Sequence, residues 1–576
     1  MENFLRYAAT RVILPVIFIT LLLTSFSVDP PLPAVKQKAQ TLFRWVFGFS
    51  TVEQRRTSLG PNVTKCQASF SDADAPVNCC AGVPSFTEEE LLATAVDFKF
   101  PEFNSSNIRV RRPVHTIKDQ DYIARYRRAT EYLKNLPLNH PHNFARQANM
   151  HCMYCTGAYD QVNYDMVLKI HRTRLFFPWH RAYLYFHERI LAKVMGEEDD
   201  NFAVPYWNWD VPEGMYMPEM FMEGSLYHFN REETHFPPLV TQNDFYRTDN
   251  NLTSEERVEA NLALMYVQMV SGARSTELFM GCPVKPGPAG WCMGLGTLEM
   301  YPHNSIHSWT GKLANPERED MGAFYSAARD PLFYSHHANI DRLWDVWRDL
   351  YDYKLEWDDP DWFESFFYFY DENMQLVRVK VSDMLDRTKL GYRYVESPTP
   401  WLNHRPKPLV KPRLAKKALA KKTDTGYVGL GGRTLDSTFT VRVPRTVTVG
   451  KEMRRKEKEE VEEMIVVYGI DAGDDVAVRF DVFVNMIDEA TAIASDARVR
   501  EYAGSFLTMR SGKRLDTATK IEGSTKLKTT FKIGISEILE DLEAVDDDSI
   551  WVTVVPRGGV TGVSIEGIKI EKSKRR

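Results

Sequence analysis

Residues 330–351 read DPLFYSHHANIDRLWDVWRDLY, and this stretch decides the fold of the first two thirds of the chain. From Ser335 onward its apolar residues recur at helical spacing, which predicts one amphipathic helix over residues 335–351. His337 lies near the N-terminal end of this helix, from which a ligand can be directed into the core of a helix bundle. The alternative interpretation is that the stripe and its histidines only pack in a hydrophobic core.

Two further stretches combine histidine with helical spacing. PHNSIHSWTG at 302–311 carries His303 and His307, which are four residues apart and therefore lie on one face of a short helix. HRAYLYFHERILAKVM at 180–195 predicts a long helix that starts with His180 and ends at a glycine. Each of these helices can direct imidazoles toward a common point.

Histidine is concentrated in this part of the chain, since thirteen of the fourteen histidines lie between His115 and His337. HCMYC at 151–155 and the later His171 add to the same region. Three imidazoles from each of two regions could hold two metal ions face to face, although a buried histidine can equally be a hydrogen-bonded core residue. Imidazole suits zinc, copper, iron and nickel, so the ligand type alone does not name the metal.

Length and composition limit the alternatives. A chain of 576 residues exceeds what one hydrophobic core normally uses, so we expect two or more domains. The 43% hydrophobic and 26% charged residues are typical of a globular protein and exclude a disordered, collagenous or coiled-coil chain. The net charge of −6 gives no overall basic field, and no nucleic-acid partner is expected.

The sequence pattern divides the chain into a helical part and a β-rich part. Residues 61–394 predict a mainly α domain with a helix-bundle core and long loops. Residues 395–435 contain five prolines and a run of basic residues, which predicts an exposed linker that proteases can cut. Residues 436–576 consist of short runs of period two and predict an all-β sandwich. This last part contains no histidine, so it is not expected to supply metal ligands.

The N-terminus predicts entry into a lumenal compartment. Residues 1–28 combine two arginines with an uncharged apolar run and are typical of a signal peptide or a signal anchor, followed by a tether at 29–60. Three glycosylation sequons begin at Asn62, Asn104 and Asn251, in agreement with lumenal exposure. We expect the vacuole as the final compartment, with the plastid thylakoid lumen or the extracellular space as alternatives. A membrane contact is expected only if the apolar run is retained.

Taken together, the histidine motifs resemble the two copper regions of plant polyphenol oxidases, which are type-3 dicopper catechol oxidases and tyrosinases. The matching stretches are HCMYC at 151–155, FFPWHR at 176–181, PHNSIHSWTG at 302–311 and DPLFYSHHANIDR at 330–342. The resemblance continues through Tyr392-Arg-Tyr394 and Arg479-Phe-Asp-Val482, with mild departures at Phe363 and Arg479. It runs from about residue 60 to the C-terminus and implies a four-helix-bundle dicopper core with two copper ions per chain.

The resemblance also implies the ligands and the cross-links. Copper A would bind His151, His171 and His180, and copper B would bind His303, His307 and His337, with His336 not counted. The implied cross-links are a thioether between Cys155 and His171 and the disulfides Cys66–Cys80 and Cys79–Cys152. We add a third disulfide, Cys282–Cys292, as a guess from the ten-residue spacing of these cysteines.

The function implied by the resemblance is oxidation of o-diphenols to o-quinones, with O2 reduced to water. The enzyme would be made in a latent form that the C-terminal domain covers until a protease cuts the linker. Phe324 would be the gate over copper B, and Glu299 would hold a water together with Asn304. This type of asparagine is associated with monophenol hydroxylation, so tyrosinase activity is an open alternative. Asp341 would orient a ligand or a helix, unless it forms an ordinary salt bridge on a helix surface.

Two other functions compete with this one. A non-catalytic oxygen carrier has the same copper chemistry but requires a permanently shielded site. A zinc hydrolase would use only one histidine triad. The sequence does not give the physiological phenol or the oligomeric state.

Overall fold

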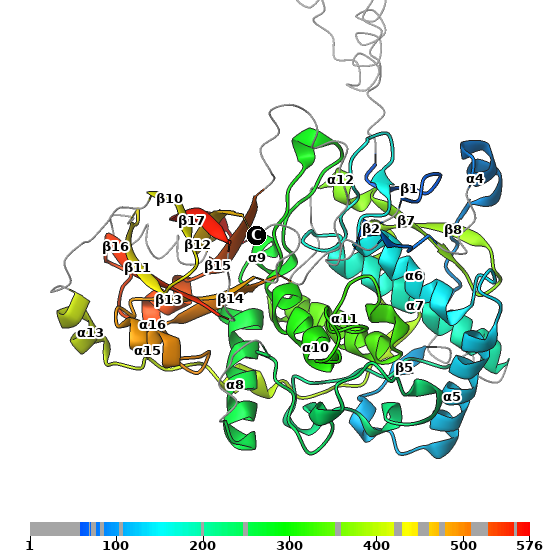
Figure 1. The fold of residues 1–576 in the computed structure, drawn as a ribbon, viewed down its shortest axis with the longest axis horizontal. Coiled ribbons are helices and arrows are strands. Elements are labelled where there is room, and N and C mark those ends of the chain that lie inside the picture. Colours follow the sequence, from blue (N-terminus) through cyan, green and yellow to red (C-terminus); the bar gives the residue numbers. More distant parts are fainter. Residues whose placement is uncertain are drawn as a thin grey trace, which may run out of the picture. The chain divides into compact units, whose positions relative to one another are not determined.

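The structure of the chain is a computed structural model (Figure 1). It describes residues 58–67, 69–70, 76–80, 86–102, 108–196, 201–245, 252–351, 359–419, 429–446, 460–471, 478–508, 528–557 and 562–575. Ser58–Arg576 forms one compact unit. This unit begins slightly before the expected boundary at residue 61, because Leu59 and Gly60 are already buried. The expected signal segment at 1–28 and most of the tether at 29–60 lie outside the described residues.

The first two thirds of the described chain is mainly helical with long connections, as expected. Its helices are α4 (Glu88–Thr94), α5 (Gln120–Asn135), α6 (Phe144–Cys155), α7 (Phe176–Met195), α8 (Ser254–Tyr266), α9 (Thr276–Met280), α10 (Asn304–Thr310), α11 (Leu332–Leu350) and α12 (Pro360–Phe363). Short strands tie the loops to this core: β1 (Pro61–Asn62), β2 (Ser69–Phe70), β3 (Pro76–Val77), β4 (Val96–Asp97), β5 (Arg109–Arg111), β6 (Asp160–Gln161), β7 (Phe366–Tyr370), β8 (Leu376–Lys380) and β9 (Tyr392–Tyr394).

Helices α6, α7, α10 and α11 form the bundle at the centre of the helical part (Figure 1). Their ends follow from local chemistry. The side chain of Asn143 accepts a hydrogen bond from the backbone of Arg146 and caps α6. Helix α7 ends at Gly196, whose φ of 100° is strained for residues with a Cβ. Helix α10 ends at Gly311, where a Cβ would lie 1.9 Å from the backbone oxygen of Arg318. Both of these ends therefore require glycine.

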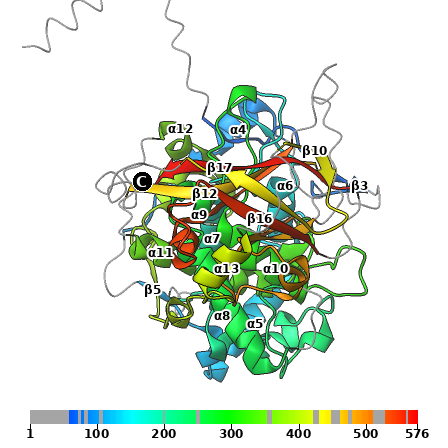
Figure 2. The same ribbon diagram turned by 90° about the vertical axis from the view of Figure 1, so that its left-hand side faces the viewer.

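The C-terminal part is a sandwich of two four-stranded antiparallel sheets (Figure 2). One sheet has the order β10 (Gly429–Thr434), β17 (Ser564–Lys574), β12 (Val461–Ile470), β15 (Thr529–Gly534). The other has the order β11 (Phe439–Pro444), β16 (Ser549–Pro556), β13 (Arg479–Val484), β14 (Tyr502–Leu507). Apolar residues of both sheets share one buried core, and the short helices α15 (Glu489–Ala494) and α16 (Ser536–Asp541) lie in the connections. The predicted all-β sandwich is therefore confirmed.

The β-sandwich packs directly against the helical part. Its core includes Leu264 and Val267 near the end of α8, and Met300 and Tyr301 just before α10. Polar contacts cross the same boundary, for example from Lys532 of β15 to Glu277 of α9 at 2.8 Å. The two predicted domains thus share buried surface within one unit.

The stretch expected to be an exposed linker, residues 395–435, is only partly exposed. Trp401 is fully buried, and its indole N–H donates to the carboxylate of Asp210. Lys407 forms a β-bridge with Val499, and β10 already begins at Gly429. The expectation was too broad because proline and basic composition do not show that one aromatic residue anchors the segment.

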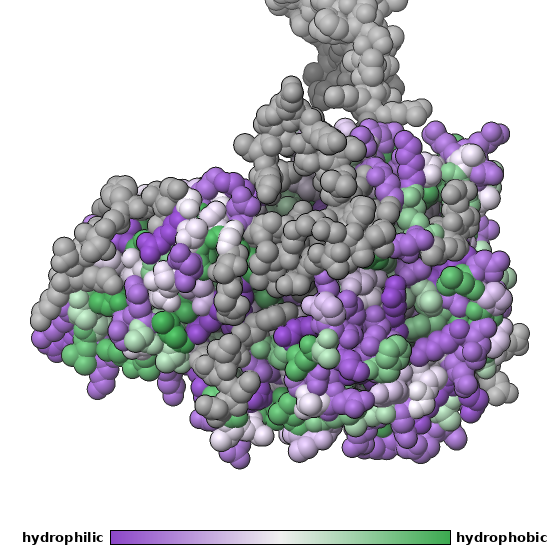
Figure 3. Space-filling view, viewed as in Figure 1, coloured by the Kyte–Doolittle hydropathy of each residue, from purple (hydrophilic) through white to green (hydrophobic). Residues whose placement is uncertain are grey.

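The exposed part of this stretch is centred on α13 (Pro412–Leu419), which has no buried residue. Leu409, Val410 and Leu414 are all exposed, and hydrophobic residues are visible on this end of the surface (Figure 3).

None of the helices in the described ranges combines the length and the apolar character that crossing a bilayer requires.

A buried carboxylate joins four elements of the helical part. Asp341 of α11 accepts hydrogen bonds from Arg111 of β5, from Arg181 of α7 and from both hydroxyls of the Tyr392-Arg-Tyr394 motif in β9. Burial acts to raise the pKa of Asp341, but the two guanidinium groups outweigh it and hold the pKa below its ordinary value. Asp341 is therefore a buried centre of charge, and the alternative of a surface salt bridge is wrong.

The substitution Asp341→Asn should destabilise the fold strongly, because it leaves two buried arginines without one of their carboxylates. We expect a loss of about 3–5 kcal/mol in the free energy of unfolding, measured by urea titration. The matched control is Asp97→Asn, which removes an exposed partner of Arg378 and should cost less than about 1 kcal/mol. Equal losses for the two variants would contradict the role given to Asp341.

Candidate metal centre

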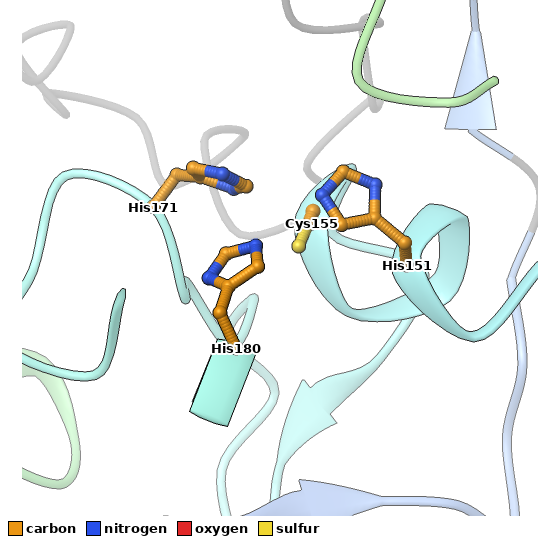
Figure 4. Close-up of side chains that lie close together, drawn as sticks. All are labelled: His151, Cys155, His171 and His180. Carbon is orange, nitrogen blue, oxygen red and sulfur yellow. The ribbon is translucent and has the colours of Figure 1, made fainter. Parts of the chain in front are cut away.

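The first histidine group lies between α6, α7 and the loop that joins them. His151 and Cys155 come from α6, His180 from the first turns of α7, and His171 from the loop (Figure 4). The potential ligand atoms of these four buried residues all lie within 4.8 Å of one another. One ion could therefore be held by this group.

The second group lies between α10 and α11. His303 ends a π-helical turn, Glu299–His303, that leads directly into α10, and His307 follows on α10 itself. His336 and His337 come from the second turn of α11. These four buried histidines also bring their ring nitrogens within 4.8 Å of one another.

The two groups face each other. The rings of His180 and His337 stack with their centroids 4.2 Å apart and an angle of 11° between their planes. The rings of His171 and His303 stack at 5.9 Å. The structure thus brings together all six predicted ligands, in two groups close enough to act on one small molecule.

Hydrogen bonds to the main chain fix the orientation of four of these imidazoles. The Nδ1 atoms of His151, His180, His303 and His307 lie 2.8–3.1 Å from the backbone oxygens of Phe324, Phe176, Glu299 and Met321, respectively. A backbone oxygen can only accept, so each Nδ1 carries the proton and each Nε2 presents a lone pair. This is the tautomer that a ligand coordinating through Nε2 requires.

Burial keeps the imidazoles neutral. It lowers the pKa of His151 to about 3, and it lowers the pKa of the other five predicted ligands well below the ordinary value. The Nε2 atoms of His151, His171, His180 and His303 are buried without a hydrogen-bond partner among the described residues. Buried polar atoms of this kind normally have a partner, and a metal ion with a preference for imidazole fits here.

The structure separates the two adjacent histidines of α11. The indole N–H of Trp209 donates to Nδ1 of His336 at 3.0 Å, so the proton of that ring must be on Nε2. The Nε2 of His337 instead lies 3.1 Å from the Nε2 of His307, as two ligands of one ion would converge. His336 has no lone pair left for a metal, in agreement with its exclusion from the expected ligands.

Glu299 and Asn304 flank His303 and are both fully buried. One carboxylate oxygen of Glu299 accepts from the backbone N–H of Arg172, and burial raises the pKa of this group to about 8. The Oδ1 of Asn304 lies 3.0 Å from the Nδ1 of His303. The second oxygen of Glu299 and the amide nitrogen of Asn304 have no partner among the described residues. The Glu299 oxygen, which accepts when the carboxyl is ionised, and the Asn304 amide, which donates, are suited to bind one water between them.

Phe324 lies beside the first group, whereas the expectation placed it over copper B. Its ring centroid is 4.4 Å from that of His171, and its backbone oxygen binds His151. This hydrogen bond fixes the backbone of Phe324 on the side of the first histidine group, and no sequence pattern reveals it.

The cysteines are paired as the sequence analysis expects. The disulfides are Cys66–Cys80, Cys79–Cys152 and Cys282–Cys292, and Cys155 is a buried thiol outside them. Figure 4 shows the sulfur of Cys155 close to the imidazoles of the first histidine group.

Two residues that position the site were missed by the sequence analysis. Arg172 adopts a φ of 65°, and its backbone N–H binds Glu299 from the residue after His171. Arginine does not favour this left-handed conformation, so the sequence carries no signal for it. Trp209 fixes the tautomer of His336, and its only signal is its place in an aromatic-rich stretch.

Three family models match the chain. Residues 141–350 match the common central domain of tyrosinase, residues 356–407 match the polyphenol oxidase middle domain, and residues 432–572 match the chloroplastic polyphenol oxidase C-terminal domain.

Similar proteins cover nearly the whole chain. Aureusidin synthase of Antirrhinum majus is 42% identical over 520 residues, which are 89% of this chain and 88% of that protein. The chloroplastic polyphenol oxidase of Vitis vinifera is 42% identical over 89% of this chain and 82% of its own length. The solved structure of latent apple tyrosinase is 39% identical, covers 83% of this chain and all of that chain, and gives a TM-score of 0.71.

The expected vacuolar location is wrong. The relatives from Vitis vinifera, Malus domestica and Ipomoea batatas are all named chloroplastic. The error has a physical reason: an apolar run with basic residues indicates passage across a membrane, and it does not identify the membrane. The thylakoid lumen, named above as an alternative, is consistent with these relatives.

The family models, the relatives and the paired histidine groups all agree. The matches are consecutive along the chain and follow the order of the helical part, the connecting part and the β-sandwich. The chain therefore belongs to the plant polyphenol oxidases, copper oxidoreductases of the tyrosinase family with a two-copper centre.

Proposed function

We propose that this protein oxidises o-diphenols to o-quinones with O2, at two copper ions held between α6, α7, α10 and α11. The observation that carries the proposal is the pair of facing groups of buried, neutral imidazoles, with unpartnered nitrogens turned inward. When bound, the copper pair supplies the two-electron redox chemistry that couples a diphenol to dioxygen.

We infer that copper A is held by His151, His171 and His180, and copper B by His303, His307 and His337. The grouping of their ring nitrogens and the fixed tautomers support this assignment. The Trp209–His336 hydrogen bond supports leaving His336 out. The backbone carbonyls act as rigid orienting groups, because they belong to elements that other contacts hold in place.

Cys155 is proposed to form a thioether with His171, in which an S–C bond replaces the S–H bond and one ring C–H bond while two protons and two electrons pass to O2. Its sulfur lies in the same group of potential ligand atoms, and it is the cysteine left outside the disulfides. Because His171 comes from a loop, a covalent bond to α6 would fix an imidazole that no helix holds.

Glu299 and Asn304 are proposed to bind a water that takes the proton of an incoming phenol. Their unpartnered oxygen and nitrogen beside His303 support this role. Phe324 would contact the substrate ring from the side of His171. A positioned proton acceptor next to the metal centre favours monophenol hydroxylation in addition to diphenol oxidation.

The C-terminal β-sandwich is proposed to keep the enzyme latent until a protease removes it. The sandwich shares buried surface with α8 and with the segment before α10. The exposed helix α13, with Arg413, Lys416 and Lys417, lies between the buried anchor Trp401 and the first strand of the sandwich. A plastid compartment on the lumenal side of a membrane fits the three disulfides and the chloroplastic relatives.

Metal analysis of two neighbouring variants tests the ligand assignment. His337→Gln should hold about one copper per chain instead of two, because it removes one of the three ligands of copper B. His336→Gln is the matched control and should keep both ions, since glutamine can still accept from Trp209. Equal copper loss in the two variants would contradict the assignment.

The variant Glu299→Gln tests the proton acceptor. Glutamine keeps an oxygen for the Arg172 N–H but loses the basicity of the carboxylate. Monophenol hydroxylation should fall by roughly 10²-fold or more while diphenol oxidation changes little. The measurement is the ratio of the two initial rates at constant copper content. An unchanged ratio would refute the role of Glu299.

Limited trypsin digestion tests latency. Cleavage at α13 should increase catechol-dependent oxygen uptake, because it breaks the covalent link that holds the sandwich against the helical part. A control with Arg413, Lys416, Lys417, Lys421 and Lys422 all replaced by Gln should stay latent under the same digestion. Reversible oxygen binding without catechol turnover after cleavage would instead favour the oxygen carrier.

A further inference from the structure

The residues just before His303 are buried in the β-sandwich, not in the helical core. Met300 and Tyr301 are 2% and 0% exposed and belong to the apolar cluster of the two sheets. Tyr301 interrupts the π-helical turn with an extended backbone, φ −142° and ψ 137°. A turn broken in this way has less internal hydrogen bonding than a regular helix, so its conformation depends on external packing.

Arg479 of β13 reaches this turn from the sandwich. Its side chain is buried, and its guanidinium carbon lies 5.8 Å from the centroid of the Tyr301 ring. One of its terminal nitrogens lies 2.6 Å from a carboxylate oxygen of Asp244, a residue of the helical part. Arg479 thus contacts the helical part at two places, and one of them is two residues before His303.

The second contact leads to the other side of His303. Asp244 is followed by Phe245, whose backbone N–H donates to the hydroxyl of Ser305 at 2.7 Å. Ser305 lies in the first turn of α10, two residues after His303. Arg479 is therefore in contact with the chain before a proposed copper ligand, at Tyr301, and is linked indirectly to the chain after it, through Asp244, Phe245 and Ser305.

Arg479 is itself held rigidly in the sandwich. It lies 3.3 Å from the carboxylate of Asp481 on the same strand. Asp481 in turn binds Arg557 at 2.7 Å and accepts a hydrogen bond from Ser505 of β14. These buried contacts span the sheet, so the position of the guanidinium group is fixed by the fold of the sandwich.

We propose that Arg479 is a positioning residue for the second copper site. From the C-terminal domain it holds the segment Glu299–Ser305, and with it the direction in which His303 presents its lone pair. In the latent form the C-terminal domain then contributes to copper retention in addition to covering the site. This inference rests on the proposed assignment of His303 as a copper ligand.

Copper retention in the full-length latent holoenzyme tests the proposal. Dialysis against EDTA should remove one of the two coppers from Arg479→Met roughly tenfold faster than from the unchanged protein, the lower end of the effect of residues that support a ligand. A lone Cu(II) ion gives an electron paramagnetic resonance signal that a coupled pair does not, so the loss of one ion is visible directly. Arg479→Lys keeps the charge and should restore most of the retention.

Arg445→Met is the matched control. It removes another buried arginine of the sandwich, which binds Glu463 at 2.9 Å and the backbone oxygen of Ala544, away from Asp481. It should leave both coppers in place. Equal copper loss from the Arg479 and Arg445 variants, or joint loss of both ions, would overturn the proposal.

Ser305→Ala provides a second test that leaves the sandwich untouched, in case Arg479→Met does not fold. It breaks the link from Phe245 to α10 and should speed the loss of the same copper. Unchanged retention in Ser305→Ala would contradict the route through Asp244. An unchanged protein that binds fewer than two coppers would instead refute the proposed function.

Discussion

The structure depends on one interaction: an imidazole whose Nδ1 donates its proton to a fixed acceptor is held with its Nε2 free to face a metal. For four of the six predicted ligands the acceptor is a backbone oxygen, and two of these oxygens lie in the loop before α11. His151 of α6 uses the carbonyl of Phe324, and His307 uses that of Met321. The loop before α11 therefore has to be placed correctly before either half of the centre is complete. Large aromatic side chains and long connections hold the loop before α11 in its position.

The boundary between the two predicted domains passes close to the metal centre. The turn that ends at His303 contacts both domains, because Tyr301 packs with the sandwich while Glu299 binds the loop after His171 in the helical part. A domain that covers a site is usually viewed as separate from it. Here the C-terminal domain and the centre share a short segment of chain, because residues just before His303 are buried in the core of the sandwich.

Much of this architecture could be predicted because its signals are local. The stripe of α11, the His303/His307 pair and the alternating residues of β13 each depend on neighbours a few positions away. Residues Trp401 and Arg172 could not be predicted in the same way. The burial of Trp401 is decided by Asp210, nearly two hundred residues earlier, and the backbone of Arg172 is held in an unfavourable conformation by long-range contacts. The side of the centre on which Phe324 lies has the same origin. Contacts between residues far apart in the chain, and not the conformational preferences of single residues, determine these features.

The disulfide between Cys79 and Cys152 joins the N-terminal segment to the residue directly after His151. A chain produced in a reducing cytosol would keep this neighbour of the ligand in place by packing alone. Recombinant production therefore has to include an oxidation step before the quality of the preparation can be judged. For the protein in its own cell, the same bond links the completion of the centre to arrival in a compartment where thiols are oxidised.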